Sequence, residues 1–318
     1  MKLSVIVPAY NLENYIVECL LSVLHQEVNF PFEVIACDDA STDSTASAIR
    51  SLAVDYPQLK TIVKPKNEGL AANMRTLLQS VKGEYIAYLD GDDIALPGKL
   101  QAQVNYLDSH PGCEMVFHES DVFDSATGQS LRLYSQSFYN WTYIPTESNI
   151  EHLVRYGTYM QASSVMFRNH SNLDNTIARD CKIILDYPFY VLNAGYLNAN
   201  IHFIGEVLGR YRIHEHSFGA QTQRSVARRE QALQDMIMTC QMALQFCKSE
   251  EVVQSGISHH QYAAALYFLF KDNDERFHHW ITASASGAGF FNKKHKLAWD
   301  LRDSPAALKD ALRNGVHL

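Results

Sequence analysis

The chain has 318 residues, of which 47% are hydrophobic and 19% are charged, and its formal net charge is −8. These values are typical of a globular protein with one large domain or two smaller ones. The acidic balance argues against broad nucleic-acid binding, because that activity needs a basic face. The notable basic cluster is short and consists of Arg224, Arg228 and Arg229.

The cysteines and the N-terminus indicate in which cellular compartment we expect the protein. The chain has six scattered cysteines with no CxxC pair, so we expect reduced thiols in a cytoplasmic protein. The opening MKLSVIVPAY is interrupted by Pro8 too soon for a signal peptide. No apolar run reaches about 18 residues, so we expect no transmembrane helix. Peripheral contact with the inner face of the membrane stays open.

Strands and helices alternate over the first 90 residues or so. Apolar, β-branched runs predict strands, and amphipathic stretches between them predict helices. The strands are Leu3–Val7, Phe32–Cys37, Leu59–Val63 and Tyr85–Leu89, and the helices are Glu13–Gln26, Thr45–Ala53 and Ala71–Val81. We expect Asn11 to cap the first helix and Ser41 or Thr42 to cap the second. The pattern predicts an α/β fold with a parallel sheet covered by helices on both faces.

Polar residues follow three of these strands: Pro8–Asn11, Asp38–Asp39 and Asp90–Asp93. Ligands of such sheets bind outside the carboxyl ends of the strands, so we expect one site at this edge. Neither GxGxxG nor GxxxxGK[ST] occurs there. A phosphate-bearing ligand would therefore be held largely by a metal ion instead of a glycine-rich loop.

The expected metal site is centred on EYIAYLDGDD, residues 84–93. Its three carboxylates within four residues repel one another unless a cation or solvent compensates their charge. Gly91 allows the backbone bend that brings carboxylates together. Oxygen ligands at this density suit Mg²⁺ or Mn²⁺. A solvated acidic turn is the alternative.

The remaining chain is less regular. We expect a helix from about Pro97 to Ser109, strands at Glu114–His118 and Ala162–Phe167, a helix at Arg179–Tyr196, and strands at Ile201–Ile204 and Val207–Ile213. Residues 118–150 contain the aromatics Tyr134, Phe138, Tyr139, Trp141 and Tyr143. They form either an acceptor surface or an insertion packed on the core. Residues 221–318 read as a helical C-terminal region, which offers a dimerisation element or a docking site.

Taken together, SVIVPAYN, CDDASTDST, NEGLAANMRTLL, YLDGDD and YRIH resemble the motifs of family 2 glycosyltransferases with the GT-A fold. The resemblance covers about residues 2–218 and is weakest over 119–157. It implies a catalytic domain at 1–220, with a nucleotide-sugar-binding half at 1–110 and an acceptor half at 111–220. It also implies an inverting enzyme whose donor is a nucleoside-diphosphate sugar, usually a UDP-sugar.

The resemblance implies a role for each strand end. Tyr10 would stack on the base and Asp39 would accept from its imide N–H, while Asp38 holds the loop; both acids alternatively cap the next helix. The other residues implied to contact the donor are Pro8, Ala9, Asn11, Glu68, Gly69, Asn73, Asp90, Gly91 and Arg212. Asp90 would face the ribose.

The metal and the base are also implied by the resemblance. Asp92 and His214 would bind Mn²⁺ or Mg²⁺ at the diphosphate, and a structural role is the alternative for His214. Asp186 would be the catalytic base, with Asp180 as the second candidate. The family usually has an acidic pair at this point, but here Leu185 precedes Asp186. An apolar setting would raise the pKa of Asp186 toward a useful value.

The implied activity is hexosyl or N-acetylhexosaminyl transfer to a glycan or glycolipid, as in surface polysaccharide or lipopolysaccharide synthesis. A catalytically inactive nucleotide-sugar-binding module is one alternative. Transfer to a protein or to a modified nucleic-acid base is another. A nucleotidyltransferase is disfavoured because a GxGxR-type loop is absent near the first strand.

Overall fold

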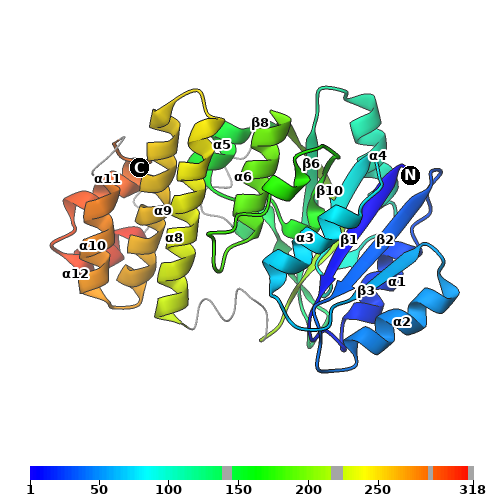
Figure 1. Ribbon diagram of the computed structural model, residues 1–318. Helices are drawn as coiled ribbons and strands as arrows, with labels where there is room; N and C mark the ends of the chain where they lie inside the picture. Colours follow the sequence, from blue (N-terminus) through cyan, green and yellow to red (C-terminus); the bar gives the residue numbers. More distant parts are fainter. Residues whose placement is uncertain (138–144, 216–224, 286–288, 314–318) are drawn as a thin grey trace.

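The computed structural model describes residues 1–137, 145–215, 225–285 and 289–313. These residues form one mixed sheet with helices on both faces and a stack of helices beside it (Figure 1). The strand order is β3-β2-β1-β4-β9-β6-β10-β5, with β7 paired to β6 and β8 paired to β10. The α/β architecture expected from the sequence is therefore confirmed.

The N-terminal half alternates as predicted. Its elements are β1 (Leu3–Ala9), α1 (Ile16–Leu24), β2 (Phe32–Asp38), α2 (Thr45–Asp55), β3 (Leu59–Val63), α3 (Leu70–Ser80) and β4 (Tyr85–Tyr88). The strands β3, β2, β1 and β4 are all parallel. Their carboxyl ends consequently meet at one edge of the sheet.

The second half makes the sheet mixed. Its elements are β5 (Ile94–Ala95), α4 (Lys99–Ser109), β6 (Met115–Asp124), β7 (Ser130–Leu133), β8 (Glu147–Asn149), α5 (Ile150–Tyr156), β9 (Met166–Arg168), α6 (Asp186–Leu197) and β10 (Asn200–Ile213). Strand β9 lies antiparallel between β4 and β6, and β5 lies antiparallel on β10. The purely parallel sheet expected from the first 90 residues is thus limited to the N-terminal half.

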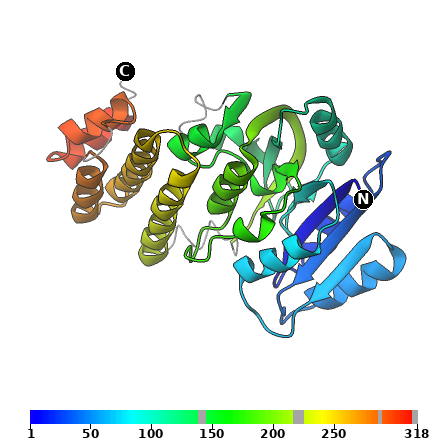
Figure 2. The same ribbon diagram turned by 45° about the horizontal axis from the view of Figure 1, so that its top comes forward.

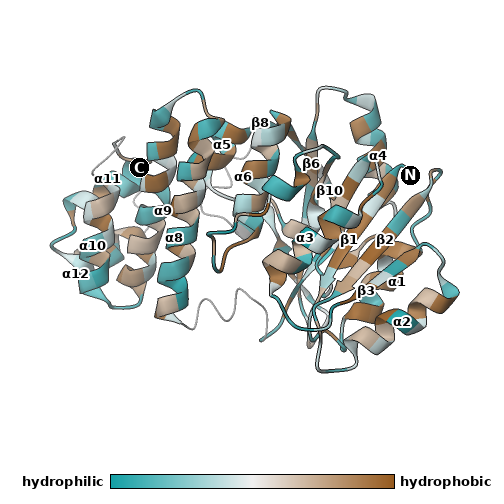
Figure 3. Ribbon diagram, in the orientation of Figure 1, coloured by the Kyte–Doolittle hydropathy of each residue, from teal (hydrophilic) through white to brown (hydrophobic). Residues whose placement is uncertain are grey.

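Each face of the sheet has its own apolar core. Helices α1, α2 and α4 pack on one face, through residues such as Ile16, Ile49 and Leu100. Helices α3, α5 and α6 pack on the other, through residues such as Leu77 and Leu153. Figure 3 shows the hydrophobic colour concentrated on β1 and β2 between these layers. Such burial on both faces explains why the strands read as continuous apolar runs.

Several local predictions were wrong. Ala162–Ser164 is a 3₁₀ turn ahead of the short β9, and the helix expected from Arg179 begins only at Asp186. The strands Ile201–Ile204 and Val207–Ile213 are one strand, β10, with irregular register between Ile204 and Gly209.

The two expected helix caps were also wrong. Asn11 has φ of 53° and its side chain accepts from the Thr42 N–H at 2.9 Å, while α1 begins at Ile16. Ser41 donates to Asp38, and the cap position of α2 is Ser44. Asn11 thus ties the end of β1 to the loop after β2, and Ser41 bonds within that loop, instead of starting a helix.

The C-terminal region is helical, as expected. It contains α8 (Val226–Met242), α9 (Glu250–Phe270), α10 (Asp274–Ser284), α11 (Lys293–Asp300) and α12 (Pro305–Arg313). The turned view separates these helices, yellow to red, from the sheet (Figure 2). Within the described ranges, no helix is long and apolar enough to span a membrane.

The helical region shares its core with the sheet. Cys240, Ala243 and Val253 belong to the same apolar cluster as residues of β4, α5 and α6. Gly256 of α9 lies against α5 so closely that an added Cβ would stand 2.4 Å from the Val154 carbonyl oxygen. Helices α8 and α9 are therefore packed into the protein and not merely appended to it.

Candidate functional site

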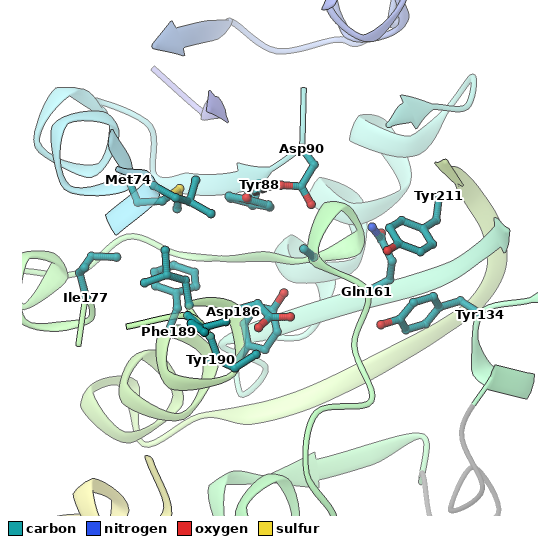
Figure 4. Close-up of a pocket in the computed structure, with 15 residues that line it drawn as sticks. Met74, Tyr88, Asp90, Tyr134, Gln161, Ile177, Asp186, Phe189, Tyr190 and Tyr211 are labelled. Atoms are coloured by element: carbon teal, nitrogen blue, oxygen red, sulfur yellow. Dashed lines mark hydrogen bonds between the residues drawn. The ribbon is translucent and has the colours of Figure 1, made fainter. Parts of the chain in front are cut away.

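A pocket of about 280 Å³ opens where the end of β4 faces the start of α6 (Figure 4). Its polar lining includes Asp90, Gln161 and Asp186, together with the hydroxyl-bearing Tyr88, Tyr134, Tyr190 and Tyr211. The remaining lining is aliphatic or aromatic carbon. This composition, mostly apolar with a few convergent polar groups, is typical of a small-molecule site.

Asp90 lies at the β4 end of the pocket. Its carboxylate accepts a hydrogen bond from the Tyr88 hydroxyl, and its N–H donates to Ser163 Oγ at 2.9 Å. Burial, with the nearby Asp92 charge, raises the pKa of Asp90 to about 7. The site thus concentrates negative charge to an extent that favours a bound cation.

Gly91 is fixed by a close approach between segments. A Cβ at this position would lie 2.8 Å from Leu12 Cδ1 and 2.9 Å from the Pro8 carbonyl oxygen. Both distances are too short for any side chain. The turn between Asp90 and Asp92 therefore packs directly against the end of β1.

Asp92 and His214 form the candidate metal site. His214 Nε2 lies 3.0 Å from Asp92 Oδ2, and the His214 ring contacts the Tyr15 ring with centroids 4.9 Å apart. The Asp92 side chain is 23% exposed, and His214 Nδ1 is buried without a hydrogen-bond partner in the described ranges. An oxygen and an imidazole nitrogen suit Mn²⁺.

The described ranges contain no group of three or more His, Cys, Asp or Glu side chains that could hold a metal ion by itself. Two protein ligands are consistent with a cation that takes its remaining ligands from phosphates and water, as Mg²⁺ commonly does. The residues present therefore fit a shared metal site better than a closed one.

Arg212 lies beneath this pair. Its Nε donates to the Asp92 carbonyl oxygen at 2.6 Å, and its Nη2 donates to Glu18 Oε2 at 2.5 Å. The guanidinium also lies over the rings of Tyr15 and Phe123. Arg212 is buried and engaged on the protein side, so the structure places it behind the predicted donor site.

Asp93 is completely buried. Its carboxylate accepts from Gln161 Nε2 at 2.7 Å, Ser163 Oγ at 2.6 Å and the Arg212 N–H at 2.9 Å. Burial and the charges of Asp92 and Asp90 raise its pKa above the ordinary value. These bonds join the DGDD turn to the 3₁₀ turn and to β10.

A buried lysine supports the same turn. Lys99 Nζ donates to the Ser163 carbonyl oxygen and lies 3.0 Å from His118 Nε2. Burial lowers the pKa of Lys99 to about 7, while the nearby Asp93 charge opposes that shift. The bond from Lys99 holds Ser163, whose hydroxyl bonds Asp90 and Asp93.

Asp186 is the first residue of α6 and lines the pocket opposite Asp90. The residue keeps an exposed surface, while desolvation on its pocket side raises the pKa of its carboxyl and a bond from the Tyr187 N–H opposes that shift. Tyr190 Oη, one turn later, is buried without a hydrogen-bond partner in the described ranges. Asp180 is exposed and does not line the pocket.

The predicted nucleotide-binding residues gather at the ends of β1, β2 and α3. Pro8 and Ala9 are buried, while Tyr10 is 45% exposed. Asp38 accepts from the Ser41 N–H at 3.0 Å and so holds its loop, as expected. Asn11 bonds the same loop.

Asp39 faces the turn before α3. It accepts from the Gly69 N–H at 2.7 Å and the Glu68 N–H at 3.2 Å, and Lys64 Nζ lies 3.4 Å away. Asn73 Nδ2 donates to the Cys37 carbonyl oxygen at 2.8 Å. Asp39, Glu68, Gly69 and Asn73 are thus together, as the motif predicted, but the carboxylate of Asp39 is 3% exposed and already bonded.

Three residues at the site could not be proposed from the sequence, namely Gln161, Ser163 and Lys99, because no motif marks them and long-range pairing brings them to the turn. Of the predicted aromatic patch, Tyr134 lines the pocket. Phe138, Tyr139, Trp141 and Tyr143 lie outside the described residues.

Comparison of structures places the fold. The first 349 residues of Staphylococcus aureus TarS, in a crystal structure with UDP-GlcNAc, superpose with a TM-score of 0.69, 19% identity, and coverage of 99% of this chain and 92% of that one. A mannosyltransferase of Pyrobaculum calidifontis, solved with GDP-Man and Mn²⁺, gives a TM-score of 0.61 at 17% identity, covering 98% and 86%. At these identities the likeness shows the fold alone.

Comparison of sequences places the family. An uncharacterized protein of Mycobacterium tuberculosis is 34% identical over 218 residues, which are 67% of this chain and 59% of that protein. This chain therefore spans less than two thirds of that relative. Residues 4–172 match the family described as glycosyl transferase family 2. With the GT-A sheet, the DGD turn at its edge and this match over half of its length, the chain belongs to glycosyl transferase family 2.

Proposed function

We propose that this protein transfers a sugar, with inversion, from a nucleoside-diphosphate sugar to a hydroxyl of a glycan or glycolipid. The donor is a UDP-sugar in the simplest form of the proposal. One observation carries it: a single pocket has Asp186 opposite Asp90. In the sequence Asp90 stands two residues before Asp92, which pairs with His214. The candidate base thus lines the same cavity as Asp90, whose neighbour Asp92 belongs to the candidate diphosphate anchor.

Asp186 is the base in this proposal. An inverting transfer needs a carboxylate that takes the proton of the acceptor hydroxyl as that oxygen attacks the anomeric carbon. Desolvation raises the pKa of Asp186, which makes its carboxylate a stronger base than a solvated one. Its place at the first turn of α6, fixed by the buried Tyr187 and Phe189, holds it in one position.

Asp92 and His214 hold the metal ion, Mn²⁺ or Mg²⁺, in this proposal. Such a cation offsets the charge that develops on the leaving nucleoside diphosphate. Arg212 and Asp93 hold Asp92 from behind, through the Asp92 carbonyl oxygen and the turn. Asp90 and Tyr88 bond hydroxyls of the donor from the end of β4.

We also propose where in the cell the enzyme works. The acceptor belongs to surface polysaccharide or lipopolysaccharide synthesis, and the enzyme works on the cytoplasmic side with peripheral membrane contact. All six cysteines are free and five are buried, which agrees with a reducing compartment. Assembly of copies through the helical region belongs to the same proposal.

Donor binding and donor hydrolysis test the proposal. UDP-, GDP- and dTDP-sugars are titrated calorimetrically with Mn²⁺, Mg²⁺ or EDTA, and slow transfer to water is followed as nucleotide release. We expect metal-dependent binding that is lost in Asp92→Asn and weakened in His214→Ala. In Asp186→Asn we expect donor binding to persist, while turnover falls by about 10²–10⁴-fold, the typical contribution of a general base.

Asp180→Asn is the matched control, because it makes the same chemical change six residues away on an exposed side chain. Its turnover should equal that of the wild type. Absence of binding to every nucleotide sugar, with either metal present, would overturn the proposal. Equal loss of turnover in both Asp variants would remove Asp186 from the role of base.

A further inference from the structure

The pocket has two chemically different sides. Figure 4 shows Met74, Ile177 and Phe189 at one end and Gln161, Tyr134 and Tyr211 at the other. Six residues form what we call the aliphatic wall: Leu70, Met74, Ile177, Ile183, Ile184 and Leu185. A hexose with hydroxyls all round would leave some of them facing this wall.

The deep part of the aliphatic wall belongs to the main core. Met74 is 4% exposed and Ile177 is 5% exposed, and both belong to the apolar cluster beneath α3 and α6. Ile184 packs against the same cluster, whereas Leu70 is 42% exposed. The carbon atoms of Met74 and Ile177 are supported from behind, so this part of the wall cannot withdraw to admit water to a buried hydroxyl.

The wall is also held in place at its backbone. Asp235 of α8 is completely buried, and its Oδ2 accepts from the N–H groups of Lys182, Ile183 and Ile184 at 3.1, 2.6 and 2.9 Å. Gln231 Nε2 donates to the other oxygen at 2.9 Å. The segment that carries half of the wall is therefore rigid before any ligand arrives.

Other parts of the lining supply hydrogen-bonding groups. Asp90 and Asp186 present carboxylates, and Tyr190 Oη is buried without a partner in the described ranges. Sugar hydroxyls on that edge would find partners. A hydroxyl on the edge that faces the wall would find none, and an unpaired buried hydroxyl weakens binding.

The wall lies next to the donor and not only next to the acceptor. Leu70 directly follows the turn that Asp39 holds, and Tyr88 and Asp90 end the strand that leads into the candidate metal residue Asp92. The sugar of a nucleoside diphosphate is attached at the second phosphate. The donated sugar must therefore lie between the metal residues and Asp186, in the pocket that the aliphatic wall lines.

On the basis of the proposed function, we infer that the donated sugar carries a methyl group. It belongs either to an acetamido group that replaces a ring hydroxyl, as in an N-acetylhexosamine, or to C6 with hydrogen in place of its hydroxyl, as in a 6-deoxyhexose. The methyl group packs on the aliphatic wall, while the remaining hydroxyls bond Asp90 and Tyr190 and leave Asp186 to the acceptor. Burial of a methyl group against the wall favours binding, whereas a hydroxyl at the same place would lose its hydrogen-bond partners and weaken binding.

Matched donor pairs test this inference by calorimetry with Mn²⁺ and the wild-type chain. The pairs are UDP-GlcNAc with UDP-glucose, dTDP-6-deoxyglucose with dTDP-glucose, and GDP-L-fucose with GDP-L-galactose. Each is compared with its free nucleoside diphosphate, which removes the contribution of the base. We expect one methyl-bearing donor to bind about tenfold to hundredfold tighter than its hydroxyl counterpart. The pair that responds separates an acetamido group from a C6 methyl group.

Two variants connect the preference to the wall. Leu185→Gln and Met74→Gln place an amide beside the methyl group, and each should reduce the preference to within about threefold, because a hydroxyl would then find a partner. Met74→Leu, which keeps the wall apolar at similar volume, should retain it. Binding of the free nucleoside diphosphate shows in each variant that the fold and the nucleotide site are intact.

The outcomes are distinguishable. If the hydroxyl-bearing member of every pair binds as tightly as its methyl counterpart, the inference is wrong and the proposed function stands. If the preference persists unchanged in both glutamine variants, the wall does not set it and the inference is wrong. If no nucleotide sugar binds, the proposed function and the inference fail together.

Discussion

Asp92 and Asp93 are neighbours in the chain, and yet their side chains lie in different surroundings. Asp92 is partly exposed and meets His214, whereas Asp93 is buried and accepts three hydrogen bonds from Gln161, Ser163 and Arg212. The sequence could not separate these two carboxylates, because both follow the same strand. The structure assigns Asp93 to holding the turn.

Asp93→Asn tests that role. An amide has one acceptor oxygen in place of two, so its NH₂ group would face donors that the carboxylate now accepts from. We expect the free energy of unfolding to fall by about 1–3 kcal/mol. We also expect the affinity for metal and donor to fall with it, because Asp92 loses its support. Thermal denaturation and metal titration measure the two effects.

Asp174→Asn is the control for this variant. Asp174 is exposed and accepts from Gln79 Nε2 at 3.1 Å on the surface, so the same isosteric change there should alter neither quantity. An unchanged melting temperature and metal affinity in Asp93→Asn would show that the turn holds its shape without this carboxylate.

At the level of elements, the contact between α9 and α5 contains buried histidines. His259 and His260 of α9 are stacked with ring centroids 5.3 Å apart, and both lie against Gly157, which follows α5. His260 also contacts the Tyr187 ring, and its Nε2 is buried without a hydrogen-bond partner in the described ranges. Such rings are stable only while they are neutral.

This packing predicts sensitivity to acid. Burial, with the Arg229 charge, lowers the pKa of His260 to about 4, and burial, with the His260 charge, also lowers the pKa of His259. The unfolded chain therefore binds more protons below its ordinary histidine pKa near 6.5, and stability falls as the pH drops from there to about 4. His260 alone accounts for about 3 kcal/mol over this interval.

Chemical denaturation at several pH values measures this loss. His260→Phe should flatten the acid side of the stability profile, since a phenyl ring takes up no proton. His279→Phe, at an exposed position of α10, should leave the slope as it is in the wild type. A wild-type profile that stays level between pH 6.5 and 4 would contradict the burial of neutral rings at this contact.

The elements also show how far sequence reasoning reaches. The strand Leu59–Val63 was predicted with the bounds that it has, because a β-branched run between turns is a local signal. The interval 179–185 was predicted as helix and is not, because its N–H groups bond Asp235, which lies 50 or more residues away. Local periodicity carries no information about such a partner.

The same distinction applies to the site. Asp90, Asp92, Asp186 and His214 could be proposed from strand ends and motifs, and the structure brings all four together. Gln161, Ser163, Tyr190 and Asp235 could not, because each reaches the site through the packing of separate segments. The candidate chemical residues were thus easier to propose than the residues that hold them in place.

On the scale of the whole molecule, Asp235 connects the C-terminal helices to the segment that lines the pocket. This one carboxylate of α8 binds the backbone just before Asp186. The 182–184 segment carries both part of the pocket wall and the approach to the candidate base. The helical region therefore has a role in positioning that its sequence did not indicate.

Asp235→Asn tests this role. An amide nitrogen or a weaker oxygen would replace the acceptor of three N–H groups, so residues 182–186 should shift and loosen. We expect kcat of donor hydrolysis to fall by at least tenfold with a smaller change in binding of free nucleoside diphosphate, because only the base side moves. Asp235→Glu, which keeps the charge, should recover part of the rate.

Asp310→Asn provides the comparison within the same helical region, since Asp310 is exposed on α12. Its kcat and nucleotide affinity should match those of the wild type. A variant Asp235→Asn whose nucleotide affinity and kcat fall in equal proportion would point to general destabilisation and not to positioning.

The short strand β5 begins one residue after Asp93 and pairs directly with β10, through Ile94 with Arg210 and Ala95 with Gly209. Two strand segments more than a hundred residues apart in sequence are thereby locked in register beside Asp92 and His214. The chain between them includes Gln161 and Ser163, which bond Asp93, so that part cannot be exchanged without loosening the turn. The exposed residues 126–130 also lie between them in sequence, and a loop there can change its length while the register at the sheet edge persists.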